Sequence, residues 1–139
     1  MKLTWHATLS ESHVTAWDEL WQRLDGHPLQ HPALAEARSR CYGQGLIYAL
    51  GYEGIDLVFG AAVQIRRSGP WPPRFAVQRG PWAVDQDRLL TGIQLMTQFT
   101  PAGRRPMTLR LDPHLPQPCD EWEQKLAVLG FATVPAELH

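Results

Sequence analysis

Hydrophobic residues along the chain recur with two different periods, which separate predicted helices from predicted strands. Near the amino terminus, steps of three and four residues predict an amphipathic helix with an apolar stripe of Val14, Trp17, Leu20, Trp21 and Leu24. Either Ser10 or Ser12 is expected to cap this helix, and Asp25-Gly26 to end it. A second helix is predicted from Pro32 to Tyr42, because proline suits the first turn of a helix and Gly43 follows the last.

Runs of apolar and alternating residues predict strands between and after these helices. The predicted strands are Leu3–Leu9, Leu46–Tyr52, Leu57–Arg66, Arg74–Val77 and a short one at Phe131–Val134. A turn at Glu53–Asp56 should join the second and third strands into an antiparallel hairpin. One face of that hairpin should be apolar, with Phe59, Ala61, Val63 and Ile65. The small residues Gly60–Ala62 predict a bulge or the close approach of another backbone.

In the second half of the chain, a predicted strand end at Arg79-Gly80-Pro81-Trp82 precedes a helix, a strand and a second helix. Asp85 or Asp87 can cap the first helix, whose apolar stripe is Leu89, Leu90, Ile93, Met96 and Phe99. The second helix should run from Asp120 to Leu129, with Trp122, Leu126 and Leu129 facing inward and Gly130 as its left-handed cap.

The predicted strand Met107–Asp112 carries polar groups on one face only. Alternation puts Met107, Leu109 and Leu111 on the packed face and Thr108, Arg110 and Asp112 on the opposite face. Pro113 cannot donate to a strand ladder, so the strand should end with the Asp112 carboxylate at its carboxyl end. Ligands of α/β sheets tend to bind outside those ends.

Length and charge narrow the class of protein. The 139 residues suit one domain, and 13 basic against 14 acidic residues give a net charge of −1, so net charge provides no support for a nucleic-acid partner. The apolar runs are too short for a membrane span, and we expect a cytoplasmic protein. Cys41 and Cys119 are expected to be reduced, partly buried thiols.

Three short motifs, Arg79-Gly80-Pro81, Arg110-Leu111-Asp112-Pro113 and Leu129-Gly130-Phe131, resemble in order and spacing those of the FemAB family of aminoacyl-tRNA-dependent peptidyltransferases. The resemblance implies a single α/β domain on the GNAT plan, with a mixed, mostly antiparallel sheet flanked by about four helices. It also implies transfer of an amino acid from tRNA to a nucleotide-linked muropeptide or a related small acceptor. Family members usually carry two such domains, so the chain is expected to correspond to one half.

The resemblance also implies roles for individual residues. By position, Arg38 is implied to contact the diphosphate of a nucleotide-linked muropeptide, although it could equally be a solvated arginine on the helix surface. Asp112 would orient or deprotonate an attacking amine, with Arg110 holding it or a substrate carboxylate; the structural alternative is an Asp112–Arg110 salt bridge. Arg79 would be a cation facing the substrate, or a partner of a backbone carbonyl.

Two tryptophans complete the predicted substrate-binding set and also suggest a surface for assembly. Trp71, in the proline-rich segment at residues 68–73, could act as a lid or pack as an anchor, and Trp82 follows the Arg79 motif. Aromatic residues are enriched where interfaces bury a few large side chains. If the chain is one half of a tandem fold, we expect it to form a homodimer or to bind a partner domain through these residues.

No cofactor or metal is predicted. Acetyl-CoA binding in this broad fold needs a glycine-rich turn at a helix start, and the nearest candidates, Gly43-Gln44-Gly45 and Arg67-Ser68-Gly69-Pro70, do not match it. His27 and His31 are each followed by proline, so one helix cannot present both to a metal. Two alternatives stay open, a non-catalytic GNAT-like binding module and a small N-acyltransferase that uses an acyl-CoA donor.

Overall fold

The computed structural model of the chain describes residues 1–67, 69–98, 108–113 and 120–132. In chain order its elements are β1 (Lys2–His6), α1 (Glu11–Arg23), the 3₁₀ turn η1 (Pro28–Gln30), α2 (Pro32–Tyr42), β2 (Gly45–Glu53), β3 (Asp56–Arg66), β4 (Arg74–Val77), β5 (Trp82–Ala83), α3 (Gln86–Gln98), β6 (Thr108–Leu111) and α4 (Asp120–Val128). Predicted positions at Phe99, Met107, Cys119 and residues 133–134 lie outside the described residues.

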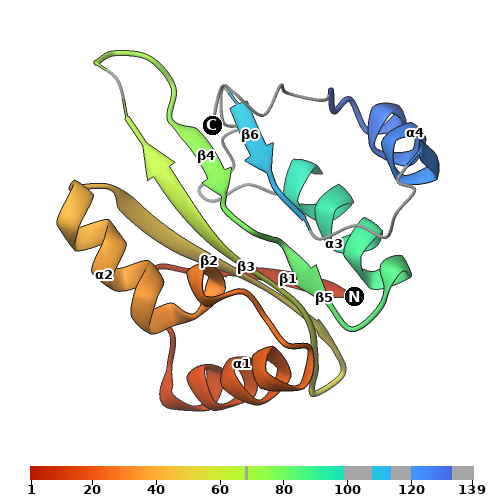
Figure 1. Ribbon diagram of the computed structural model, residues 1–139, viewed down its shortest axis with the longest axis horizontal. Helices are drawn as coiled ribbons and strands as arrows, with labels where there is room; N and C mark the ends of the chain where they lie inside the picture. The colour runs from red at the N-terminus through yellow and green to blue at the C-terminus, as the bar shows by residue number, and fades with distance from the viewer. Residues whose placement is uncertain (68, 99–107, 114–119, 133–139) are drawn as a thin grey trace.

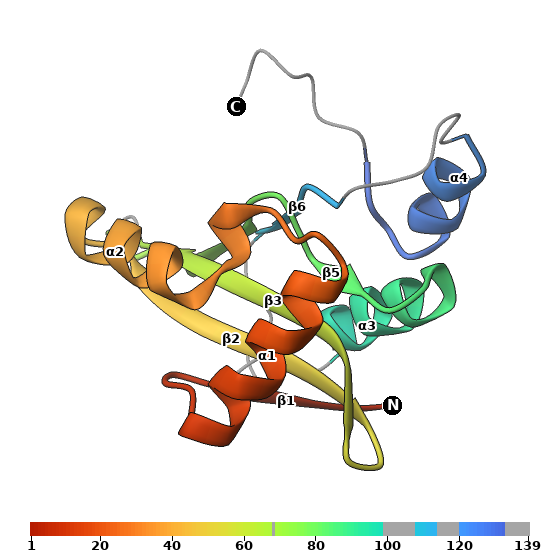
Figure 2. The ribbon, with the colours of Figure 1, turned by 60° about the horizontal axis from the view of Figure 1, so that its bottom comes forward.

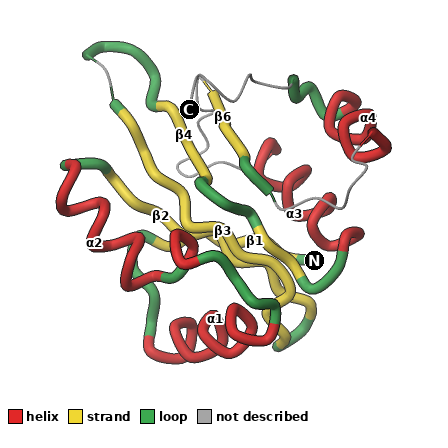
Figure 3. The backbone as a smooth tube through the Cα atoms, viewed as in Figure 1, coloured by secondary structure: helices red, strands yellow, loops and turns green. Residues whose placement is uncertain are grey.

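The strands form one twisted sheet in the order β1-β2-β3-β4-β6, with β5 paired to β3 (Figure 1). Among the described pairs, β4 and β6 alone run parallel, and the others are antiparallel. This confirms the predicted mixed, mostly antiparallel sheet, which four α-helices flank in the described part of the chain (Figure 3). None of the described helices is long and apolar enough to cross a membrane.

The sheet packs helices on both faces (Figure 2). On one face α1 and α2 cover β2 and β3 in a buried cluster of Trp17, Leu20, Ala35, Tyr48, Leu50, Leu57 and Ala62. On the other face α3 and α4 lie against a larger cluster that includes Phe59, Ala61, Val63, Phe75, Val77, Ile93, Met96 and Trp122. The pairing of β2 with β3 shifts by one residue between Gly51 and Tyr52, so Leu57 faces the opposite side from Phe59.

Helix and turn boundaries follow the expected capping chemistry. Ser10 Oγ accepts a hydrogen bond from the backbone N of His13 at the start of α1. Gly43, with φ of 63°, ends α2 in the left-handed conformation, and Gly130, with φ of 94°, does the same after α4. Asp85, rather than Asp87, caps α3 through its Oδ1.

Some predictions of burial were wrong. Val14 is exposed, because the sheet contacts α1 chiefly at Trp17 and Leu20, a narrower strip than the apolar stripe; Trp21 is partly buried and packs at the edge of that cluster. Cys41 is exposed, since six residues at 100° each place it about 240° around α2 from the buried Ala35. Phe131, expected to begin a strand, lies outside any strand.

Candidate functional site

The strand that begins at Arg74 is interrupted between Val77 and Trp82 and then resumes as β5, which pairs with β3. Within the interruption Arg79 has a φ of 55°, in the left-handed region, and Pro81 has no N–H to donate. The segment predicted as a strand end is therefore a break within a strand. Here the sheet loses part of its pairing between β3 and the β4–β5 strand.

The side chain of Gln30 fills the break from the side of α1 and α2. Its Nε2 donates to Gln78 O at 2.5 Å and lies 3.4 Å from Ala62 O, while its Oε1 accepts from Ala62 N at 2.8 Å. Gln30 is only 1% exposed. A Cβ at Gly80 would lie 2.7 Å from Gln30 Cδ, so glycine is required for this close approach.

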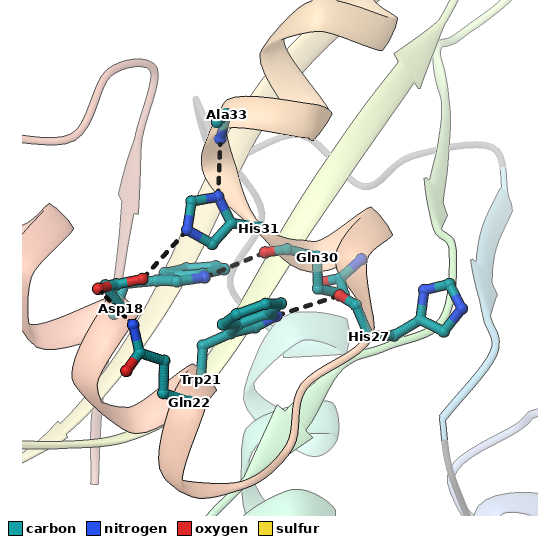
Figure 4. Close-up of polar contacts among 8 residues, drawn as sticks. Asp18, Trp21, Gln22, His27, Gln30, His31 and Ala33 are labelled. Carbon is teal, nitrogen blue, oxygen red and sulfur yellow. Dashed lines mark hydrogen bonds and ion pairs between the residues drawn. The ribbon is translucent and has the colours of Figure 1, made fainter.

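Hydrogen bonds from α1 hold the segment that carries Gln30. Trp17 Nε1 donates to Gln30 O at 3.0 Å, and Trp21 Nε1 donates to His27 O at 3.1 Å. In Figure 4, His31 lies between Asp18 and the backbone of Ala33. Its Nδ1 accepts from Ala33 N at 3.2 Å, which leaves Nε2 to donate to Asp18 at 3.1 Å.

These contacts give the two loop histidines structural roles. His27 Nδ1 accepts from Leu29 N at the start of η1, as His31 Nδ1 does from Ala33 N at the start of α2. Within the described ranges, no three His, Cys, Asp or Glu side chains lie close enough together to hold a metal ion.

Asp112 lies at the carboxyl end of β6, next to the break. β6 pairs with β4 from Arg74–Thr108 to Val77–Leu111, and Asp112 N then donates to Gly80 O at 2.9 Å. The side chains of Arg79 and Asp112 approach to 3.8 Å between Nε and Oδ2, and both are more than half exposed. Such an exposed pair contributes little stability but is accessible to a ligand.

Asp112 forms its salt bridge with a different arginine from the one considered in the sequence analysis. The salt bridge joins Asp112 to Arg79, not to Arg110, because the strand break turns Arg79 toward the end of β6. Leu109 and Leu111 pack against the α3 side of the sheet, so Arg110 lies on the α1–α2 side, as alternation predicted. Arg110 has no ion-pair partner among the described residues.

The remaining predicted binding residues are spread over the molecule. The Arg38 guanidinium lies 5.7 Å from the ring centre of Tyr42, and no recorded contact joins it to Arg79 or Asp112 within the described residues. The Trp82 ring packs edge-on against Trp17, with centroids 4.8 Å apart, and covers Gly60. The predicted close approach at Gly60 is thus made by an indole rather than by a backbone.

Trp71 is exposed, unlike Trp82. The residue is 66% exposed in the connection between β3 and β4, which rules out the packed-anchor alternative in this structure. The lid and assembly roles stay predictions.

Carboxylates occupy the start of α3. Asp85 Oδ1 accepts from Arg88 N at 2.8 Å, and Asp85 Oδ2 accepts from Arg88 Nη1 at 3.0 Å. Glu53, from the end of β2, accepts from Arg88 Nε at 2.9 Å and is the largest cause of the raised pKa of Arg88. The amides of this helix start therefore bind a carboxylate of the chain itself.

Two crystal structures share this arrangement of strands and helices. One is described as a probable acetyltransferase, with a TM-score of 0.56 and 12% identity over 97% of this chain and 92% of that one. The other is a mutant of TTHA1254 from Thermus thermophilus, with a TM-score of 0.57, 20% identity and the same coverage. No protein-family model and no curated protein matches the chain.

The chain thus shares its fold with a protein described as a probable acetyltransferase, and this likeness agrees with the predicted fold class. The likeness does not extend to the FemAB family, so aminoacyl transfer, which the FemAB resemblance implied, stays a prediction.

Sequence reasoning missed Gln30 and its role in the break. A glutamine in a loop between two His-Pro pairs carries no periodic signal, and its partners Ala62 and Gln78 lie 32 and 48 residues away. The positive-φ position at Arg79 gave no signal either, because arginine is not typical of the left-handed region. Gly80-Pro81 was the one hint, since this dipeptide is typical of turns.

Proposed function

We propose that the chain transfers an acyl group to an amine at the break between β4 and β5. The observation that carries this proposal is the Arg79–Asp112 pair, 3.8 Å apart and accessible, at the carboxyl ends of the two parallel strands. Its support is the fold shared with a probable acetyltransferase over 97% of the chain. Ligands of α/β sheets tend to bind outside the carboxyl ends of parallel strands, and β4 and β6 are the parallel pair here.

The two side chains have complementary tasks in this reaction. The Asp112 carboxylate accepts a hydrogen bond from the attacking amine, which orients the nitrogen lone pair toward the acyl carbon and gives the proton a place to go. The Arg79 guanidinium donates to the oxygen that gains negative charge as the carbonyl becomes tetrahedral. Collapse of that intermediate forms the amide and expels the leaving group of the donor.

For the donor, we propose an aminoacyl ester, as in the FemAB reaction, and for the acceptor a muropeptide or a related small amine. The capped start of α3 supports this donor over acyl-CoA, because the Asp85 carboxylate already occupies the helix start that a pyrophosphate would need. The second candidate is an acyl-CoA-dependent N-acyltransferase, which the likeness to a probable acetyltransferase favours. The third is a binding module without catalysis.

The test compares donors directly. Purified chain is incubated with a nucleotide-linked muropeptide and either tRNA charged with labelled amino acids or labelled acetyl-CoA, and the product is identified by mass spectrometry. We expect label on the muropeptide from aminoacyl-tRNA and loss of that product with Asp112→Asn. Transfer from acetyl-CoA alone would select the second candidate, and no transfer from either donor, with saturable muropeptide binding, would select the third.

A further inference from the structure

Three arginines occupy neighbouring strands on the α1–α2 face of the sheet. The strand register places Arg66 of β3 directly opposite Arg74 of β4, with Thr108 of β6 beside Arg74. Arg110 lies two residues further along β6 on the same face. None of the three arginines forms an ion pair with any residue that the structure describes.

This arrangement is electrostatically unfavourable without a ligand. Like charges directly opposite each other on neighbouring strands destabilise a sheet. The Nε of Arg66 is also buried and has no hydrogen-bond partner within the described ranges. An anion bound between the guanidinium groups on this face would remove both costs, because a guanidinium donates in pairs to oxyanions.

A buried amide adjoins the arginines. Gln64 lies on the same face, two residues from Arg66, and is only 6% exposed, but its Oε1 has no hydrogen-bond partner in the described part of the chain. Gln64 of β3 lies opposite Ala76 of β4, and Ala76 in turn lies opposite Arg110 of β6. The Ala76 methyl group therefore separates two long polar side chains on strands about 10 Å apart, from two spacings of about 4.8 Å.

We propose that this face, formed by Gln64, Arg66, Arg74 and Arg110, binds an oxyanion group of the acyl acceptor, a phosphate or a carboxylate. The guanidinium groups bind the oxyanion. The Gln64 amide bonds a neighbouring polar group of the same ligand, since a buried amide requires a partner. That the ligand is the acceptor rests on the proposed function, whereas the anion site itself is argued from the strand register and from the unpaired groups of Arg66 and Gln64.

The geometry also sets the size of the ligand. Arg110 precedes Asp112 by two residues and Thr108 precedes it by four, which at about 3.3 Å per residue corresponds to about 7 and 13 Å along β6. The acceptor should therefore carry its anionic group about 7–13 Å from the amine that reacts beside Asp112. A simple amine without a negative charge would leave the arginines of this face without an anionic partner.

The site is tested with two anions of different chemistry, inorganic pyrophosphate and succinate, by calorimetry at constant ionic strength. We expect at least one to bind, and Arg66→Gln or Arg110→Gln to weaken that binding by about tenfold or more. Arg23→Gln removes the same charge from the exposed surface of α1 and should have no effect. The tighter of the two probes identifies the oxyanion as phosphate or carboxylate.

Arg110→Lys serves as a control for misfolding, because lysine keeps the positive charge and loses only the paired hydrogen-bond donors. The thermal unfolding of each variant is measured in parallel. Absence of binding by both probes, or equal weakening by Arg23→Gln, would overturn the inference. The outcome of this binding experiment can be distinguished from the outcome of the acyl-transfer assay. Anion binding that depends on Arg66 and Arg110 supports the site even if no acyl transfer occurs, and acyl transfer without such binding contradicts the site alone.

Discussion

The side chain of Gln30 bonds the backbone of Ala62 in place of a neighbouring strand, with Oε1 2.8 Å from Ala62 N and Nε2 3.4 Å from Ala62 O. β3 pairs with β4 from Gln64 onward and with β5 up to Gly60, which leaves Ala62 beside the break. The connection between α1 and α2 is thus part of the sheet at the point where the candidate site forms. Packing of α1 and the geometry of the site are therefore coupled.

Gln30→Leu, which keeps the side-chain volume, should lower the free energy of unfolding by about 3 kcal/mol. The reason is that Ala62 N and Gln78 O lose a buried partner, and each such loss costs about 1–3 kcal/mol. Chemical denaturation measures the change. The control is Gln22→Leu on the exposed side of α1, which removes one surface hydrogen bond, and equal losses in the two variants would show that Gln30 does not support the break.

Leu111→Asp should destabilise the chain by several kcal/mol, and Arg110→Ala by about 1 kcal/mol or less. Leu111 packs against the core on the α3 side, whereas Arg110 points to the other face. Chemical denaturation of both variants is the measurement. If both lose the same stability, the assignment of faces along β6 is incorrect.

The order and type of the elements were predictable because they depend on local patterns. The stripe through Trp17 and Leu20, the proline at the start of α2, and the alternation of Leu109 and Leu111 each leave a mark in consecutive residues. Val14 and Cys41 were misjudged, because the area of a helix that a sheet covers depends on packing between distant segments. The interruption at residues 78–81 could not be predicted for the same reason, because it also depends on packing between distant segments.

The candidate site was predicted in part. Asp112 was placed correctly at the carboxyl end of β6, since Pro113 ends a strand by local sterics. Asp112 pairs with Arg79, and Arg66 lies opposite Arg74, only because of the order and register of the strands. No single stretch of sequence specifies these two properties. Gln30 depends on both a loop conformation and the break that it fills.

Stability should fall as the pH drops below about 6.5. His6 lies against His13, with ring centroids 4.5 Å apart, and its pKa is lowered by burial and then by the neighbouring imidazole. The unfolded chain therefore binds the proton more readily, so acid favours unfolding in this window. His6→Gln should flatten the dependence of the unfolding free energy on pH between neutral and mildly acidic conditions. An unchanged slope would exclude His6 as the cause.

Self-association stays a prediction that concentration-dependent light scattering can test. The exposed Trp71 is the remaining candidate for the dimer surface, because Trp82 packs beneath α1 against Trp17. We expect a dimer whose dissociation constant rises with Trp71→Ser. A monomeric mass at every concentration would contradict the predicted dimer. A dimer that Trp71→Ser does not weaken would show that the interface lies elsewhere.

The most direct test of acyl transfer at the break is the single-turnover rate of Asp112→Asn with aminoacyl-tRNA and a muropeptide as substrates. The substitution keeps the shape of the side chain and removes its ability to take a proton. We expect a rate loss of about 100-fold or more, as for removal of a general base. Asp56→Asn, at the exposed start of β3, should keep the wild-type rate. Equal rates for Asp112→Asn and the wild type would contradict the account.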